Sequence, residues 1–251
     1  MNSGIEHALN QDDMTSTQST DTPAFPTCRY LILQLGDKNT YRSPLYSQNE
    51  ILAGPDFETE KDEEGFKYLQ TPGGRFDLND VLKQLPKSQK PDVILVKADA
   101  TNRIFPQNLT SADCAKVLVL GNTQHLTQPI QTLVEYAKKE RFNYYLTDHK
   151  AHHLHFFVEA GLENVHWIPG LNYNLITREL NPKPRIPVSF IGQVGDFHPY
   201  RKWLITQLAK NKCPIYVNRH DRQTTINYYA DSQITLNISL NGDLNLRVFE
   251  V

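Results

Sequence analysis

The folded sequence begins with the run Tyr30-Leu31-Ile32-Leu33-Gln34-Leu35, which Gly36 and Asp37 close. A continuous apolar run of this length is typical of a strand buried on both faces, as the strands of parallel sheets are. The same pattern recurs four times before residue 169, at 92–96, 116–121, 144–146 and 165–168. The sequence therefore predicts a parallel sheet in the first part of the chain.

Helical patterns lie between these runs. Asp77 precedes an amphipathic stretch that ends at Pro86, and residues 129–139 carry one apolar stripe with a basic last turn. A third stretch runs over 151–160 and stops at Gly161. Strands that alternate with helices predict right-handed βαβ units. The expected fold class is α/β, with a parallel sheet covered by helices on both faces.

Two segments break this alternation. Residues 1–28 are rich in Ser, Thr, Asp, Gln and Asn and lack apolar periodicity, so a disordered polar tail is expected there. Three prolines lie between residues 182 and 187, which is typical of an extended connector. A proline-rich linker is therefore expected at 181–187, between a first domain at 29–180 and a second at 188–251.

The alternation restarts after this linker. Strands are expected at 188–192, 215–217 and 234–237, and helices at 200–210 and 224–230. The helix at 200–210 is expected to turn Trp203, Leu204 and Leu208 inward. Residues 246–251 are interpreted as the opening of a further helix.

Composition excludes several classes of protein. The 251 residues include 26 Lys+Arg and 28 Asp+Glu, so the chain as a whole carries no basic footprint for nucleic acid. No apolar run approaches the ~20 residues that span a bilayer, and the polar N-terminus lacks a signal-peptide pattern. Cys28, Cys114 and Cys213 lie far apart, which fits a reducing compartment. We expect a cytoplasmic protein with no nucleic-acid partner and no transmembrane segment.

Candidate binding residues follow the predicted strands, because ligands of open α/β sheets bind beyond the carboxyl ends of the strands. Gly192-Gln193-Val194-Gly195 lies between a strand and a helix, where glycines let the backbone approach a phosphate. A plain turn explains this loop equally well. The segment from Asn241 to Glu250 offers amides and a cation for phosphates and a carboxylate for ribose hydroxyls. Its alternative is a polar surface loop with a capped helix.

Histidines gather near two of the predicted strand ends. His125 is either a donor to a sugar or phosphate oxygen or a structural histidine. His149 and His153 have helical spacing, but Lys150 would repel a cation, and no Cys or carboxylate stands at ligand spacing. A helix start with one histidine available to substrate is favoured, and no metal site is expected. No motif supports covalent nucleophilic catalysis or zinc-dependent hydrolysis.

Several segments together resemble the GT-B glycosyltransferases, and within them the CgeB-like group with a "glycosyl transferases group 1" C-terminal module. They are residues 118–125 and 156–170 in the first half, and 188–192 with Arg201, 228–237 and 246–250 in the second. The resemblance covers 29–251. It implies two Rossmann-like domains of GT-B type, the first on the acceptor side and the second binding the donor. It also implies an enzyme that moves a sugar from a nucleotide-sugar donor to an acceptor.

The resemblance assigns donor-binding roles in the second half. Glu250 corresponds to a carboxylate that binds the donor ribose, and Gly192 would flank the same pocket. The residues expected near the diphosphate are Arg247 and the loop Asn241, Gly242 and Asp243. Helix dipoles and basic side chains generally stabilise the departing diphosphate in such enzymes, so the resemblance requires no metal.

The catalytic candidates that the resemblance implies are His125 and His149, which would face the donor sugar from the first domain. Asn122 and Gln124 stand where Asp and His are expected in relatives. This departure argues against a general base in that loop.

The sequence ends one residue after Glu250, whereas donor sites of this family are completed by elements beyond that point. The resemblance therefore predicts an incomplete second domain and an impaired transferase. The acceptor class stays open among glycan, protein and small molecule, and no cofactor is expected because the nucleotide sugar is a substrate. The alternative is a non-catalytic nucleotide-sugar or glycan-binding module. A third hypothesis is a Rossmann-type regulatory or interaction domain.

Overall fold

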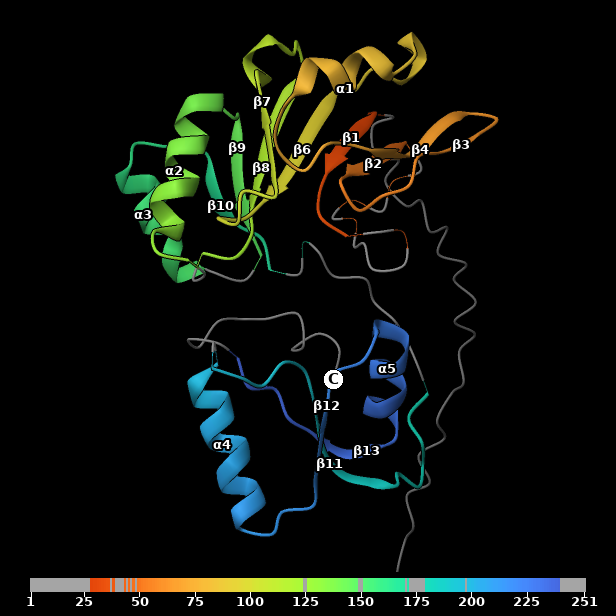
Figure 1. Ribbon diagram of the computed structural model, residues 1–251, viewed down its shortest axis with the longest axis vertical. Coiled ribbons are helices and arrows are strands. Elements are labelled where there is room, and N and C mark those ends of the chain that lie inside the picture. Colours follow the sequence, from red (N-terminus) through yellow and green to blue (C-terminus); the bar gives the residue numbers. More distant parts are fainter. Residues whose placement is uncertain are drawn as a thin grey trace, which may run out of the picture.

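The computed structural model describes residues 28–36, 38, 43, 45, 47, 49–123, 126–148, 151–169, 171, 179–196 and 198–239. Within these residues the chain forms an eight-stranded sheet, a three-stranded sheet and a two-stranded sheet, with helices packed on them (Figure 1). The fold class is α/β, as the sequence predicts. The predicted tail lies outside the described residues apart from Cys28, and so does the predicted helix opening at 246–251.

The eight-stranded sheet has the order β10-β9-β8-β6-β1-β2-β4-β3. All its neighbouring strands are parallel except β3 and β4. A separate parallel pair is formed by β5 and β7. The strands of this half are β1 Tyr30–Leu33, β2 Glu50–Gly54, β3 Glu60–Asp62, β4 Gly65–Gln70, β5 Gly74–Asp77, β6 Val93–Ala98, β7 Ile104–Gln107, β8 Ala115–Leu120, β9 Tyr144–Thr147 and β10 Val165–Trp167.

The described helices of this half all lie on one face of the large sheet. The described residues include no helix on the second face, where the sequence predicts one as well. They are α1 Leu78–Gln84, α2 Pro129–Glu140 and α3 Leu154–Glu159, with short 3₁₀ turns at η1 Lys87–Gln89, η2 Leu109–Ser111 and η3 Ala151–His153. One apolar core contains Leu78 of α1, Leu133 of α2 and Phe157 of α3.

Handedness explains this one-sided cover. Parallel crossovers are right-handed, so connections that move in the same direction across a sheet lie on the same face. The steps from β4 to β6, from β8 to β9 and from β9 to β10 all move in one direction, and they carry α1, α2 and α3. The step from β1 to β2 moves the other way and carries no helix among its described residues. The opposite face therefore packs against other segments, including Leu45, Phe57 and Leu171.

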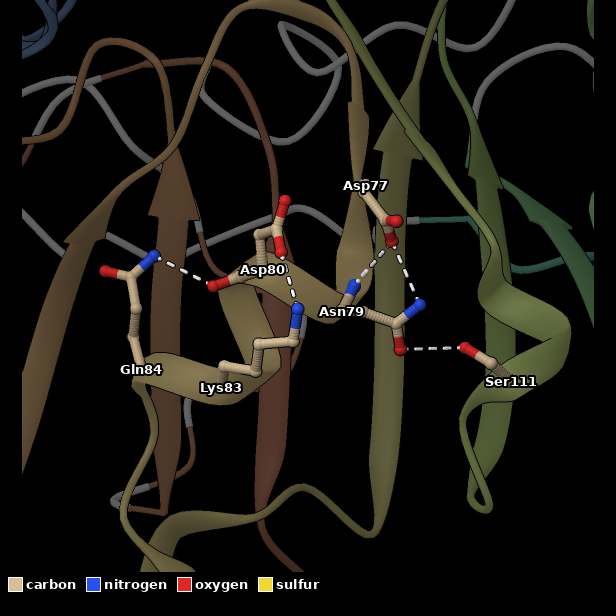
Figure 2. A network of polar contacts seen from close by, with 6 residues as sticks. All are labelled: Asp77, Asn79, Asp80, Lys83, Gln84 and Ser111. Carbon is tan, nitrogen blue, oxygen red and sulfur yellow. Dashed lines mark hydrogen bonds and ion pairs between the residues drawn. The ribbon is translucent and has the colours of Figure 1, made fainter.

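A polar network fixes the start of α1, as Figure 2 shows. The Asp77 carboxylate accepts hydrogen bonds from the backbone amide of Asn79 at 2.9 Å and from its side-chain amide at 3.0 Å. The hydroxyl of Ser111 donates to Asn79 Oδ1 at 2.9 Å and so ties η2 to this helix start. Asp77 is the N-cap, as the sequence predicts, because its carboxylate satisfies an amide that has no partner inside the helix.

The second half forms a parallel sheet of three strands in the order β12-β11-β13. Its strands are β11 Ile186–Ile191, β12 Ile215–Asn218 and β13 Ser232–Thr235, and its helices are α4 Pro199–Lys210 and α5 Arg222–Ala230. The steps from β11 to β12 and from β12 to β13 move in opposite directions, so right-handed crossovers require opposite faces for their helices. Figure 1 draws α4 and α5 on the two sides of this sheet accordingly.

Two details of this half differ from the sequence-based expectations. β11 begins at Ile186, inside the expected linker at 181–187. Trp203 is 55% exposed rather than turned inward. Arg201 and Ile205 are the buried residues of α4, and Leu204 packs beside them, so the inner face of the helix excludes Trp203.

No described helix has the length and apolarity to cross a bilayer. The longest, α2 and α4, have 12 residues each, against the ~20 that a membrane span needs.

Candidate functional site

Gly192 is the one predicted site residue that the structure describes. It directly follows β11, the central strand of the three-stranded sheet, and it is half-buried. Its backbone amide donates to the Asn218 carbonyl at the end of β12 at 2.8 Å. Gly192 therefore lies at the carboxyl edge of a parallel sheet, where the strand order reverses between β11 and β13. This is the position at which open α/β sheets bind ligands.

Arg201 joins the two segments that leave this edge. Its guanidinium is buried and donates from Nη1 to the Gln193 carbonyl at 2.8 Å. Its Nε and Nη2 donate to the Ile238 carbonyl at 3.1 and 2.8 Å. Gln193 follows β11 and Ile238 follows β13, so one side chain from α4 holds together the two loops at the point of reversal. The guanidinium also lies over the Phe190 ring, 5.3 Å from its centroid.

The loop after β11 leaves open space at Gly195. A Cβ built on this residue meets no heavy atom within 4 Å. The amide of His198 donates to the Gly195 carbonyl at 2.9 Å and brings the chain into α4, which starts at Pro199. The first turn of a helix has amides without partners inside the helix. An anionic group that approaches this loop would meet the amides of the first turn of α4, beside the exposed ion pair of Asp196 with Lys202.

The other predicted site residues lie outside the described residues. In the first half these are His125 and His149, the two catalytic candidates, although their neighbours Thr123 and Asp148 are described. In the second half they are Asn241, Gly242, Asp243, Arg247 and Glu250. Their placement at the donor site stays a prediction.

The carboxyl edge of the eight-stranded sheet collects buried polar side chains. Five residues at or just beyond the ends of β1, β4, β8 and β9 are at most 5% exposed: Gln34, Thr71, Thr123, Thr147 and Asp148. The strands themselves are lined by apolar residues on both faces. Because ligands of open α/β sheets bind at the carboxyl edge, this cluster of buried polar side chains makes the edge a second candidate site.

His153 lies at this edge, beside the end of β8. Its Nδ1 and the Thr123 hydroxyl are 2.5 Å apart, which links η3 to the loop after β8. Nearby, Trp167 Nε1 donates to the Asp148 carbonyl at 3.2 Å, which joins the ends of β9 and β10. The histidine that contacts this edge in the described residues is therefore His153, which the sequence places at helical spacing from His149.

Gln34 is the residue that sequence reasoning missed. It is 1% exposed, and neither its Oε1 nor its Nε2 has a hydrogen-bond partner among the described residues. Its backbone amide donates to the Ala53 carbonyl at 2.9 Å, so it extends the pairing of β1 with β2. In the sequence it sits inside an apolar run and looks like part of the strand. The sequence signal that could have revealed Gln34 is a polar residue at the last position of an otherwise apolar strand run.

A carboxylate frames this second edge. Asp56, which follows β2, accepts a hydrogen bond from the Gly36 amide after β1 at 3.3 Å. Arg103, in the segment after β6, donates to both oxygens of Asp56 at 3.2 Å. One carboxylate therefore connects the segments that follow β1, β2 and β6.

Two hollows in the described part of the chain lie at the opposite, amino ends of the strands. One, of about 670 Å³, is lined by residues around the starts of β8 and β9, including Ala115 and Tyr144. The other, of about 550 Å³, lies beside Asp231, whose carboxylate accepts from Arg185 Nε at 2.8 Å. The hydrogen bond from Arg185 lowers the pKa of Asp231 to about 2. This ion pair ties the segment before β11 to the end of α5, which is a structural role.

Comparisons with known proteins add no assignment to these two edges. Neither a protein-family model nor a curated protein matches the chain.

Proposed function

We propose that the chain is a glycosyltransferase of GT-B type, which moves a sugar from a nucleotide-sugar donor to an acceptor. The main observation in support of this proposal is that segments on which the resemblance rests lie close together in the structure. Gly192 ends the segment 188–192, and Arg201 bonds to the carbonyl of Ile238, the residue after the segment 228–237. The segment 188–192, Arg201 and the segment 228–237 are separate in the sequence. They meet at the point where the strand order reverses between β11 and β13.

The chemistry of this edge supports donor binding. The open backbone at Gly195 and the start of α4 suit the diphosphate of a nucleotide sugar, because amides there have no partner inside the helix. In the proposal, Arg247 and the loop 241–243 bind the diphosphate and Glu250 binds the ribose. Arg201 is proposed as a positioning residue, since it holds the two loops together.

The transfer step needs a stabilised leaving group. As the glycosidic bond to the donor phosphate breaks, negative charge develops on the nucleoside diphosphate, and fixed donors aimed at that position lower the barrier. The proposal assigns this to the loop after β11 and to Arg247. His125 and His149 are proposed to face the sugar from the first domain.

The experiment is a thermal-shift panel on the full chain with UDP-, GDP-, dTDP- and ADP-linked sugars. A ligand that binds only the folded chain raises the melting temperature by an amount that grows with its concentration. One nucleotide class is expected to give such a shift. Arg247→Ala and Glu250→Gln are expected to remove it, whereas Lys210→Ala, an exposed cation at the end of α4, keeps it.

A transfer assay then separates enzyme from binding module. Release of the nucleoside diphosphate from the bound donor supports the transferase. Binding without release supports the non-catalytic module instead. No shift with any nucleotide sugar, or an equal shift in all three variants, contradicts both.

A further inference from the structure

The strand order of the eight-stranded sheet reverses between β1 and β6. From β1 the chain moves to β2 on one side, and from β6 it moves to β8 on the other. The crevice outside the carboxyl ends of two such strands is the place where open α/β sheets hold ligands. Gln34 directly follows β1 at this point.

The carboxamide of Gln34 is held in place but lacks a partner among the described residues. Its backbone is paired with Ala53, and the main chain of Gly54 approaches so closely that a Cβ there would lie 2.0 Å from the Gln34 carbonyl oxygen. The side chain is 1% exposed, with Oε1 and Nε2 both unpaired. Unpaired polar atoms of this kind are rare in folded proteins, because burial removes their hydration without replacing it.

The surroundings define the ligand. Side chains alternate along a strand, so Gln34 lies on the same face of the sheet as Ile32. The core on that face consists of Ile32, Leu52, Phe57, Leu95 and Val119. Lys97, two residues beyond Leu95 near the end of β6, lies on the same face and is half-buried. A carboxamide presents an acceptor beside a donor, so its complement is a group with a donor beside an acceptor.

We propose that Gln34 binds the edge of a small ligand in the crevice between β1 and β6. The ligand presents a hydrogen-bond donor next to an acceptor, as the edge of a nucleobase or a primary amide does. The Asp56 carboxylate, with its bonds to the Gly36 amide and to Arg103, holds the segments that frame the crevice. This inference stands on Gln34 and is independent of the transferase proposal.

The test measures binding of uridine, cytidine, adenosine, guanosine and nicotinamide to the full chain by saturation-transfer NMR. Gln34→Met keeps the length of the side chain and removes its carboxamide, and Gln34→Leu serves as a second apolar variant. Gln70→Met changes an exposed glutamine at the end of β4 and is the matched control. At least one probe is expected to bind the wild type and Gln70→Met. Both Gln34 variants are expected to lose at least about tenfold in affinity for it.

Stability separates this loss from misfolding. The melting temperature of Gln34→Met is expected to equal or exceed that of the wild type, because an apolar side chain replaces an unpaired buried amide. The proposal is overturned if no probe binds the wild type, which would assign a buried water to Gln34. It is overturned equally if Gln34→Met binds the probe as the wild type does. This includes the case in which Glu250→Gln abolishes binding and Gln34→Met does not, because the probe then binds at the proposed donor site.

Discussion

The two parallel sheets hold their carboxyl edges together in different ways. In the eight-stranded sheet the main chains touch directly: Gly54 packs on the carbonyl of Gln34, and a Cβ at Gly121 would lie 3.0 Å from the Ala98 carbonyl oxygen. In the three-stranded sheet a long side chain, Arg201, spans the gap between Gln193 and Ile238. The space around Gly195 stays open.

Because of this difference, the two edges offer different chemical groups to a ligand. Close backbone contact holds β1 against β2 at the first edge, and the side-chain amide of Gln34 is left unpaired among the described residues. At the second edge, the buried guanidinium of Arg201 donates its hydrogen bonds to backbone carbonyls. A ligand there would therefore contact the open backbone around Gly195. The first edge offers a side-chain amide to a hydrogen-bonding group, and the second offers backbone amides to an anion.

The largest expected effect comes from Gly54→Ala. The new methyl group would lie 2.0 Å from a backbone oxygen that cannot move without breaking the pairing of β1 with β2. We expect a loss of about 3 kcal/mol in the free energy of unfolding, measured by urea denaturation. Gly195→Ala is the matched change at the other edge and is expected to leave stability unchanged, because nothing lies within 4 Å of the added carbon. Equal losses in both variants would contradict the comparison.

Arg201→Met is expected to give the next largest effect. It leaves the carbonyls of Gln193 and Ile238 without their charged donor, which corresponds to a loss of about 2 kcal/mol. The loss should be local, so amide hydrogen exchange is expected to accelerate in β11 and β13 and to stay unchanged in β1 and β6. Lys210→Met, at the exposed end of the same helix, controls for the removal of a cation. Uniform acceleration across both sheets would argue against a local clamp.

The third prediction concerns Glu50, the first residue of β2 in the eight-stranded sheet. Burial raises the pKa of the Glu50 carboxyl, although the Ser43 hydroxyl, which donates to it at 2.6 Å, partly offsets this. A raised pKa means that the protonated form is favoured in the folded state. The associated stability is present below the unfolded pKa of about 4.3 and is lost as the pH rises through the folded pKa.

The neutral side chain that Glu50→Gln introduces should therefore stabilise the fold at pH 7 and have little effect at pH 4. Thermal denaturation at the two pH values measures this. Glu58→Gln, which changes an exposed carboxylate close by, is the control. A gain of equal size at both pH values would rule out the titration of Glu50 as its cause.

The smallest effect is expected from Asp231→Asn in the second sheet. Arg185 lowers the pKa of Asp231 to about 2, so the ion pair contributes stability above the unfolded pKa, which is lost as the pH falls toward 2. The variant should melt slightly below the wild type at pH 7, and the two should converge in acid. Asp92→Asn breaks the equivalent pair with Arg29 in the first sheet and should behave alike, because both arginines are exposed.

The regular strands and helices of the chain are predictable from the sequence. The apolar runs that start near Tyr30, Val93 and Val117 correspond to β1, β6 and β8 within one or two residues. β3 and β5 escape prediction because they are short and carry charged residues. β2 escapes because its apolar run has only three residues, and β4 because polar residues interrupt its apolar ones. These strands owe their form to pairing with neighbours rather than to local preference.

The strand ends that frame the candidate site are predictable from the sequence, but the contacts at them are not. The rule that ligands lie beyond strand ends leads to Gly192 and to the loops after β8 and β9, which the structure places at the carboxyl ends of their strands. The partnerless amide of Gln34 and the clamp of Arg201 are invisible in the sequence, because they depend on which distant backbone atoms come close. The face that carries the described helices depends on the directions of the strand connections, which the sequence does not show either.

The outermost strand β3 has a consequence for how copies of the chain meet. An edge strand has free backbone groups that can pair with another chain and extend a sheet from molecule to molecule. β3 consists of Glu60, Lys61 and Asp62, all exposed, and Lys67 forms an ion pair with Asp62 at 2.7 Å. A second copy that docked here would have to strip water from these charges. The chain thus protects this border of its largest sheet from aggregation with three residues.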